Sequence, residues 1–226
     1  ILIGLVGSEM CIRDRSLGDS ATLVCEWPIS NRVRQPVEIF GHNENGQEDS
    51  FLLRGRIDRV DEINVEGQAD GQRLIIIRDM KTVNGPKLNQ RGQRHRKAIF
   101  DELQLALYAK AWEAANPNDR VVGVGITEVG DDTEYYVEMD PEYIDSVQHM
   151  SIGKITTYTS MTYRDIDEKT GGSSNGFRAW LEERVRTALR VIGGAKAGHV
   201  NPTVSDDCKY CTVRRLCPSA KLGGKL

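Results

Sequence analysis

The sequence predicts an α/β protein with a mixed central β-sheet, helices flanking the sheet and a cysteine-rich tail. Three observations lead to this fold class. Short β-type runs separated by polar turns come first, amphipathic segments with helical spacing follow, and three of the five cysteines lie after residue 207. The resulting order, βββαβ(β)αα, is typical of a sheet covered by helices.

Composition limits what the protein can do. The chain has 226 residues, which is enough for one substantial domain with a small appendage. A hydrophobic content of 39% and a charged content of 28% are ordinary for a globular protein. The net charge of -3 argues against a broad polyanion-binding surface, so any nucleic-acid contact needs a local basic patch. No apolar segment is long enough to cross a bilayer, and we expect a cytoplasmic protein without a membrane partner.

The first residues are expected to be foreign to the protein. There is no initiator Met, and residues 5–15 resemble translated sequencing-adapter read-through. Such a segment is excluded from fold reasoning, and the native N-terminal part is then missing. We therefore expect an artefact over 1–15, a folded core over 16–200 and a cysteine-rich tail over 201–226.

Three β-type segments are expected first, at 36–40, 51–60 and 73–81. Short polar turns between them predict an antiparallel meander. The pattern of segment 98–115 is helical, and Asn116-Pro117-Asn118 ends it. Residues 120–129 and 133–139 return to a β pattern and are expected to pair. Further helices are expected from Pro141 to about residue 159 and over 177–192, where Gly193-Gly194 follows.

Asp79-Met80-Lys81 comes directly after an apolar run at 74–77 and carries the strongest chemical signal. Side chains alternate along a strand, so Asp79 and Lys81 project from the same face. Asp58 ends a similar upstream segment, and paired carboxylates suit Mg²⁺, which prefers oxygen ligands. Such an ion could support phosphodiester hydrolysis, with Lys81 positioning water or neutralising charge. The alternative is an exposed ion pair at a strand end, which is commoner for an isolated Asp-x-Lys.

Gln104 and Tyr108 are four residues apart in the predicted helix and share one of its faces. That face suits a helix whose edge borders a charged site. Taken alone, the two residues fit equally a surface Gln and an interfacial Tyr.

The order of these motifs resembles the PD-(D/E)XK nuclease superfamily, and within it the RecB/AddB-type branch that includes CRISPR-associated exonucleases. The segments that carry the resemblance are 55–61, 77–82 and 104–108, and it extends over residues 37–218. It implies a restriction-endonuclease-like core. It also implies a metal-dependent DNA nuclease, of the exonuclease kind, that acts in DNA repair, recombination or phage/CRISPR DNA processing. The implied partners are DNA and a helicase or a recombination or CRISPR protein.

The resemblance also assigns roles to the motif residues. Asp58, Asp79 and the Met80 carbonyl would bind Mg²⁺ or Mn²⁺, and Lys81 would be the catalytic lysine. Gln104 and Tyr108 would support the site and nearby DNA. Members commonly supply a further His or Glu from upstream, for which Glu38 is the candidate here.

The tail has the pattern C-x₂-C-x₅-C at Cys208, Cys211 and Cys217. Close thiols in a cytosolic protein are metal ligands more often than disulfides, and four thiolates suit Zn²⁺ or an iron–sulfur cluster. Spacing alone favours zinc. The resemblance implies a [4Fe–4S] cluster instead, with a fourth cysteine from before the core, either Cys25 or Cys11. For Cys25 an ordinary buried thiol is the alternative.

A cluster of basic residues lies between the Asp-x-Lys segment and the next helix. Its members are Lys87, Arg91, Arg94, His95, Arg96 and Lys97. In an otherwise acidic chain this cluster could bind a phosphate backbone, and a solvated loop fits equally well.

Two other functions are compatible with the sequence. One is a catalytically inactive DNA-binding or scaffold module stabilised by an iron–sulfur or zinc site. The other is a zinc-stabilised protein-interaction domain with no nucleic-acid role.

Overall fold

The computed structural model describes residues 20–29, 35–65, 68, 71–82, 99, 102–129, 134–147, 152, 154–155, 176–199, 208, 211–212 and 216–217. The chain divides into two compact units, Ile1–Leu189 and Arg190–Leu226. All strands of the described residues, and the candidate active site, belong to the first unit. The expected division at residues 15 and 200 stays a prediction.

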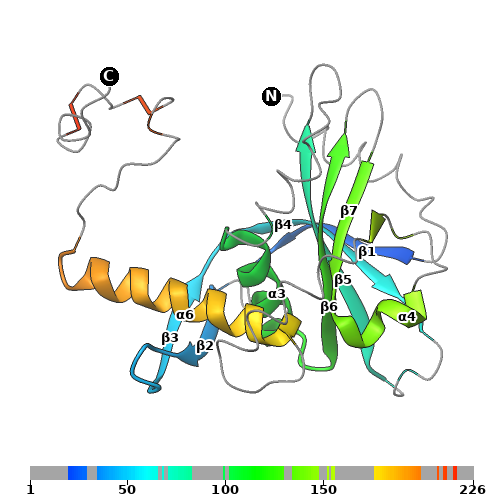
Figure 1. Cartoon of the computed structure of the whole chain (residues 1–226), viewed down its shortest axis with the longest axis horizontal. Coiled ribbons are helices and arrows are strands. Elements are labelled where there is room, and N and C mark those ends of the chain that lie inside the picture. The colour runs from blue at the N-terminus through cyan, green and yellow to red at the C-terminus, as the bar shows by residue number, and fades with distance from the viewer. Residues whose placement is uncertain are drawn as a thin grey trace. The chain divides into compact units, whose positions relative to one another are not determined.

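The main sheet of the described residues has six strands in the order β1-β4-β5-β6-β7-β8 (Figure 1). These are β1 (Ser20–Pro28), β4 (Arg56–Ile63), β5 (Arg73–Thr82), β6 (Asp119–Val129), β7 (Glu134–Met139) and β8 (Lys154–Ile155). β5 pairs parallel with β6, and β4 and β7 run antiparallel to these two central strands. The expected mixed α/β class is therefore confirmed, and so is the pairing of 120–129 with 133–139.

The expected meander is wrong. β2 (Val37–His42) and β3 (Glu48–Leu53) form a separate two-stranded sheet, and the segment expected as one strand over 51–60 is interrupted at Arg54-Gly55. β1, which we did not expect as a strand, occupies the position beside β4 instead. The hairpin has an alternating pattern, with Val37 and Ile39 buried and Phe40 exposed, so it needs only one covered face.

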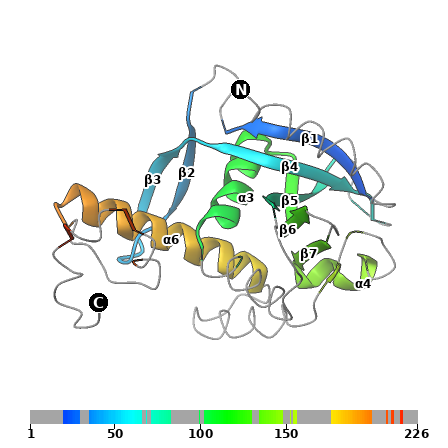
Figure 2. The same ribbon diagram turned by 90° about the horizontal axis from the view of Figure 1, so that it is seen from above.

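α3 (Gln104–Ala115) lies between the main sheet and the β2–β3 hairpin, which Figure 2 shows. It ends at Asn116, as expected, where the backbone and the side-chain amide of Asn116 both donate to the Trp112 carbonyl. The first turns of α6 (Gly176–Lys196) pack against α3 and β2. A Cβ at Gly41 would lie 2.4 Å from Val185 Cγ1, so only a glycine permits this contact.

Two helix predictions need correction. The helix expected over 141–159 is a short η1 (Pro141–Tyr143) followed by α4 (Ile144–Val147), and Lys154–Ile155 is the strand β8. α6 runs past Gly193 and Gly194 to Lys196. Gly198 has φ +85°, the left-handed conformation that commonly terminates helices, so it is the glycine that follows the helix end.

The sheet buries both faces at its centre. α3 covers the face that carries Asp79, which we call the site face. On the opposite face Val147 and Ile152 pack on a cluster with Ile63, Leu74, Ile76, Val122, Val137 and Met139. Within the described part of the chain, no helix combines the length and the apolar character that crossing a membrane requires.

Candidate active site

The site lies where β4 parts from β5. These two strands pair antiparallel up to the rung Arg59–Arg78, whereas β4 continues beside β1 as far as Arg56. We call the opening beyond the Arg59–Arg78 rung the fork. Asp58 and Asp79 are the next residues on the two strands, so both acids lie in the fork on the site face.

Asp58 replaces the missing strand contact. Its Oδ2 accepts a hydrogen bond from the Met80 backbone N–H at 2.9 Å. The Asp58 carboxylate therefore connects β4 to β5 where the two strands separate. The Met80 N–H, which has no backbone partner on β4 there, is satisfied by this contact. This contact ties the position of Asp58 to the backbone of β5.

Asp79 is the buried member of the pair. Its side chain is 7% exposed, against 45% for Lys81, and Lys81 Nζ lies 2.7 Å from Asp79 Oδ2. The other oxygen, Oδ1, accepts from Gln104 Nε2 at 3.0 Å. The expected convergence of Asp79 and Lys81 on one face is confirmed, and the pair is not a solvated surface contact because the carboxylate lies within the core.

The electrostatics of the site favour a bound cation. Burial raises the pKa of the Asp79 carboxyl, Lys81 works against this rise, and the neighbouring charge of Asp58 adds to it. Burial alone would lower the pKa of Lys81, but Asp79, Glu102 and Asp58 outweigh it and raise that pKa. Lys81 is therefore an ammonium ion at neutral pH, held among three acidic groups.

α3 supports the site from one side. Gln104 Nε2 donates to Asp79 Oδ1 and, at 3.3 Å, to the Tyr108 hydroxyl oxygen. Both amide hydrogens of Gln104 are used, which fixes the orientation of its side chain. A Cβ at Gly55 would lie 3.2 Å from Ile29 Cδ1 and 3.6 Å from Tyr108 Cε1, so this glycine lets the chain pass close to Tyr108.

A small recess opens beside these groups and includes three residues that were not expected at the site, Glu102, Leu105 and Ile126. It is lined by Asp79, Lys81, Glu102, Gln104, Leu105 and Ile126. Glu102 is exposed and precedes α3 by two residues, a position that resembles an ordinary helix-start acid in sequence. Ile126 pairs with Asp79 across β5 and β6, so only the register of the sheet could have revealed it.

The donor chemistry at the fork fits a divalent metal ion. Asp58 and Asp79 present oxygen ligands of the kind that Mg²⁺ and Mn²⁺ prefer. Burial, and to a smaller extent the charge of Asp58, raises the pKa of Asp79, and a cation between the two acids would offset both effects. Among the described residues, no group of three or more His, Cys, Asp and Glu side chains is arranged to hold a metal. Two carboxylates are consistent with a Mg²⁺ site, because this ion usually keeps several waters.

Glu38 is not brought to the fork. It lies on the exposed face of the hairpin, where its Oε1 accepts from Ser50 Oγ at 2.6 Å. The hairpin is a different sheet from the one that holds Asp58 and Asp79. Its proposed role as an upstream ligand therefore finds no support in this arrangement.

The cysteines give a mixed outcome. Cys25 is disulfide-bonded in this structure, and its role as a cluster ligand stays a prediction. Cys208, Cys211 and Cys217 form no disulfide, and the Cys211 N–H donates to the Cys208 carbonyl at 3.3 Å. The basic residues Lys87, Arg91, Arg94, Arg96 and Lys97 lie outside the described residues.

Comparison with known proteins identifies the family of this chain. Residues 17–218 match the family described as the PD-(D/E)XK nuclease superfamily, whose members are typically nucleases that use divalent metal ions. One solved structure, titled "Crystal structure of SSO0001", is 14% identical, with a TM-score of 0.33 and coverage of 97% of this chain and 70% of that one. None of the curated proteins matches the chain. The motifs of the fork and the extent of the family match lead to one assignment: this chain belongs to the PD-(D/E)XK nuclease superfamily.

Proposed function

We propose that the protein is a Mg²⁺- or Mn²⁺-dependent deoxyribonuclease that hydrolyses phosphodiester bonds in DNA. One observation carries this proposal. Asp58 and Asp79 lie next to each other in the fork, and Lys81 is paired with Asp79 at 2.7 Å. A repulsive pair of acids that is held this close costs stability, which is typical of a functional site.

Each residue of the fork has a distinct task. Asp58 and Asp79 would hold the metal ion, with the Met80 carbonyl as a further ligand. When bound, the ion would polarise a phosphoryl oxygen and acidify the attacking water. Lys81 carries positive charge at neutral pH and would stabilise the charge that develops on the phosphate. Gln104 would hold the Asp79 carboxylate in one orientation, and Tyr108 would hold Gln104.

The test is cleavage of end-labelled linear DNA by the full chain, with Mg²⁺ and with EDTA. We expect Mg²⁺-dependent cleavage that Asp79→Ala abolishes and that Lys81→Ala reduces by about 100-fold or more. Glu182→Ala is a matched control. Glu182 lies on α6, away from the fork, and pairs with Lys110 of α3. Cleavage at the wild-type rate by either fork variant would contradict the mechanism.

We further assign the protein to the RecB/AddB-type branch, as an exonuclease in DNA repair, recombination or phage/CRISPR DNA processing, with a helicase or a recombination or CRISPR protein as partner. The contacts of Gln104 with Asp79 and Tyr108 support this proposal, because they give the two helix residues that carry part of the resemblance a role at the site. Release of nucleotides only from DNA ends would support it. Cleavage of circular DNA at the same rate as linear DNA would contradict it.

For the tail we propose a [4Fe–4S] cluster with Cys208, Cys211 and Cys217 as three of its ligands. The three cysteines form no disulfide and are close in sequence, which supports metal ligation. Anaerobically purified protein should contain iron and sulfide and absorb broadly in the visible range. One equivalent of zinc without iron would instead identify a zinc site.

A second candidate function is a catalytically inactive DNA-binding or scaffold module. The observation in its favour is that, among the described residues, no three His, Cys, Asp or Glu side chains are arranged to hold a metal ion. DNA binding that survives EDTA, with no cleavage when Mg²⁺ or Mn²⁺ is returned, would favour this module over the nuclease.

A further inference from the structure

Three charged residues lie directly behind the candidate active site, on the opposite face of the sheet. Arg59 and Arg78 form the last rung before the fork, and each is the chain neighbour of one of the two acids. Asp61 lies two residues along β4, so its side chain is on the same face as the two arginines. The side chains of all three residues are 0–1% exposed.

Asp61 joins the two strands through both of its oxygens. Oδ1 accepts from Arg59 Nε at 2.6 Å, and Oδ2 accepts from Arg78 Nε at 2.6 Å. Arg78 also donates through Nη2 to the Ile152 carbonyl at 2.7 Å, and its guanidinium lies 6.0 Å from the centre of the Tyr135 ring. One carboxylate thus holds a guanidinium from β4 and another from β5 in fixed positions.

Stability alone does not account for this cluster. All three members are buried charged groups, and the desolvation cost of such groups can exceed their attraction. Well-packed apolar side chains would often stabilise the same strands equally well. What the charged cluster adds is a directional contact at one rung, because each Nε–H and its carboxylate oxygen must meet in a specific geometry.

We propose that Arg59, Asp61 and Arg78 are positioning residues that fix where the fork opens, and thereby the separation of Asp58 and Asp79. The inference rests on the proposed function, because it concerns the same two acids. Asp58 is bonded to Arg59 and Asp79 to Arg78 along the chain. A shift of the Arg59–Arg78 pair would therefore shift both carboxylates. The hydrogen bond from the Met80 N–H to Asp58 depends on the position of Asp58, so the exchange rate of this amide measures that position in the metal-free protein.

The main variant is Arg59→Met. It leaves Asp61 paired with Arg78 through Oδ2. We expect Mn²⁺ affinity, measured by titration calorimetry without DNA, to fall about 10- to 100-fold, as is typical when a supporting partner of a ligand is removed. Hydrogen exchange at the Met80 amide should become faster in the metal-free protein. Arg59→Lys keeps the charge and should recover most of the affinity.

Arg73→Met is the matched control. Arg73 begins β5, the neighbour of the β4 strand that holds Arg59, and lies at the other end of β5 from the fork. It forms a bidentate ion pair with Asp119 at 2.8 Å for each contact. This variant should lose stability, yet keep the wild-type Mn²⁺ affinity and Met80 exchange rate. A purely structural role for Arg59 predicts that the two variants change both quantities equally at equal loss of melting temperature. That result, or wild-type behaviour of Arg59→Met, would overturn the inference.

Two precautions keep the outcomes separate. If Arg59→Met does not fold, Arg59→Gln replaces it, with the same expected changes and the same contradicting result. A wild-type protein that binds Mn²⁺ but leaves DNA intact contradicts the proposed nuclease, while the comparison of variants still tests the positioning role. Exchange at Met80 tests that role even in a protein that binds no metal.

Discussion

The two ends of the paired strands β5 and β6 are both charged, but their charges are arranged in opposite ways. At the first end Asp119 is held by two contacts from Arg73, at 2.8 Å each, and by Trp112 Nε1 at 2.9 Å. At the second end Asp79 faces another acid, Asp58, and both share the charge of Lys81. One end is electrostatically satisfied and the other is held in repulsion.

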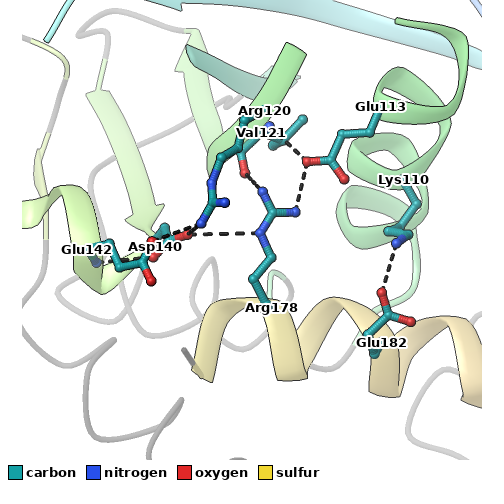
Figure 3. Close-up of polar contacts among 8 residues, drawn as sticks. All are labelled: Lys110, Glu113, Arg120, Val121, Asp140, Glu142, Arg178 and Glu182. Carbon is teal, nitrogen blue, oxygen red and sulfur yellow. Dashed lines mark hydrogen bonds and ion pairs between the residues drawn. The ribbon is translucent and has the colours of Figure 1, made fainter. Parts of the chain in front are cut away.

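A larger network of charged contacts, shown in Figure 3, includes the next two residues of β6, Arg120 and Val121. Arg178 projects from α6 and donates to Glu113 Oε1 at 2.8 Å and to the Val121 carbonyl at 2.7 Å. Arg120 lies 3.4 Å from Asp140 and 2.9 Å from Glu142. Glu113, Asp140 and Glu142 each have an arginine partner, and Glu182 pairs with Lys110. These contacts join α3, β6 and α6 at that end.

The charges at the first end of β5 and β6 serve stability, whereas those at the second end are arranged for binding. Paired charges at the first end need no ligand. At the second end, burial and the charge of Asp58 raise the pKa of Asp79, so the metal-free protein pays for keeping the two acids together. A bound cation would remove that cost, and this is the reason to expect binding at the fork and not at the first end.

The largest effect is expected from the same substitution made at the two ends. Asp79→Asn should abolish Mg²⁺-dependent cleavage while it preserves or raises stability, because it removes a repulsive charge. Asp119→Asn should lower the free energy of unfolding by about 1–3 kcal/mol, because Arg73 loses its charged partner. Urea unfolding and DNA cleavage, measured on both variants, check the prediction.

The control for this pair is the Mn²⁺ affinity of Asp119→Asn, which should equal that of the wild type. Loss of stability in Asp79→Asn that matches the loss in Asp119→Asn would remove the distinction between the two ends. Residual cleavage by Asp79→Asn at the wild-type rate would move the active site elsewhere.

Arg178→Met tests whether the network of Figure 3 is purely structural. The variant leaves the Glu113 carboxylate with the Val121 N–H as its contact and should lower the free energy of unfolding by about 1–3 kcal/mol. Cleavage measured well below the melting temperature should be unchanged. A shift in the Mg²⁺ dependence of cleavage would mean that the first end influences the fork.

The residues of the fork could be predicted from sequence because they belong to local motifs. Asp79 and Lys81 follow an apolar strand, and Gln104 and Tyr108 are one helical turn apart, so spacing alone gives their common faces. Glu102 and the Arg59–Asp61–Arg78 cluster could not be found in this way. Their roles depend on which strands pair and in which register, and no local pattern contains that information.

The errors in the fold have a similar origin. Arg54-Gly55 interrupts a segment that was expected to form one continuous strand over 51–60. At this point the chain passes from one sheet to the other, and Gly55 packs close to Ile29 and Tyr108. Gly193 and Gly194 are helix-compatible residues in α6, because a glycine ends a helix through its φ and not through its presence. Tertiary contacts decided both cases.

Tyr108→Phe should sharpen the comparison within the fork itself. It removes the acceptor that holds the second Gln104 hydrogen, so one polar group loses a partner worth about 1 kcal/mol. If that energy is used to orient Asp79, cleavage should fall about fivefold. The measurement is kcat at saturating DNA. Tyr143→Phe, on the η1 turn, is the control and should keep the wild-type kcat.

The smallest expected effect is a difference in alkaline stability between the two ends. The folded pKa of Lys81 is raised above 10.5, so the stability that its charge contributes is present below that pH and is lost as the pH rises through the folded pKa. Because the side chain is 45% exposed, we expect a contribution of about 1 kcal/mol or less. Urea unfolding should therefore separate Lys81→Met from the wild type at pH 9 and bring the two together above the folded pKa. Arg73→Met should stay separated from the wild type over the same range, since a guanidinium keeps its proton there. A Lys81→Met difference that persists at high pH would show that Lys81 stabilises the fork through packing and not through its charge.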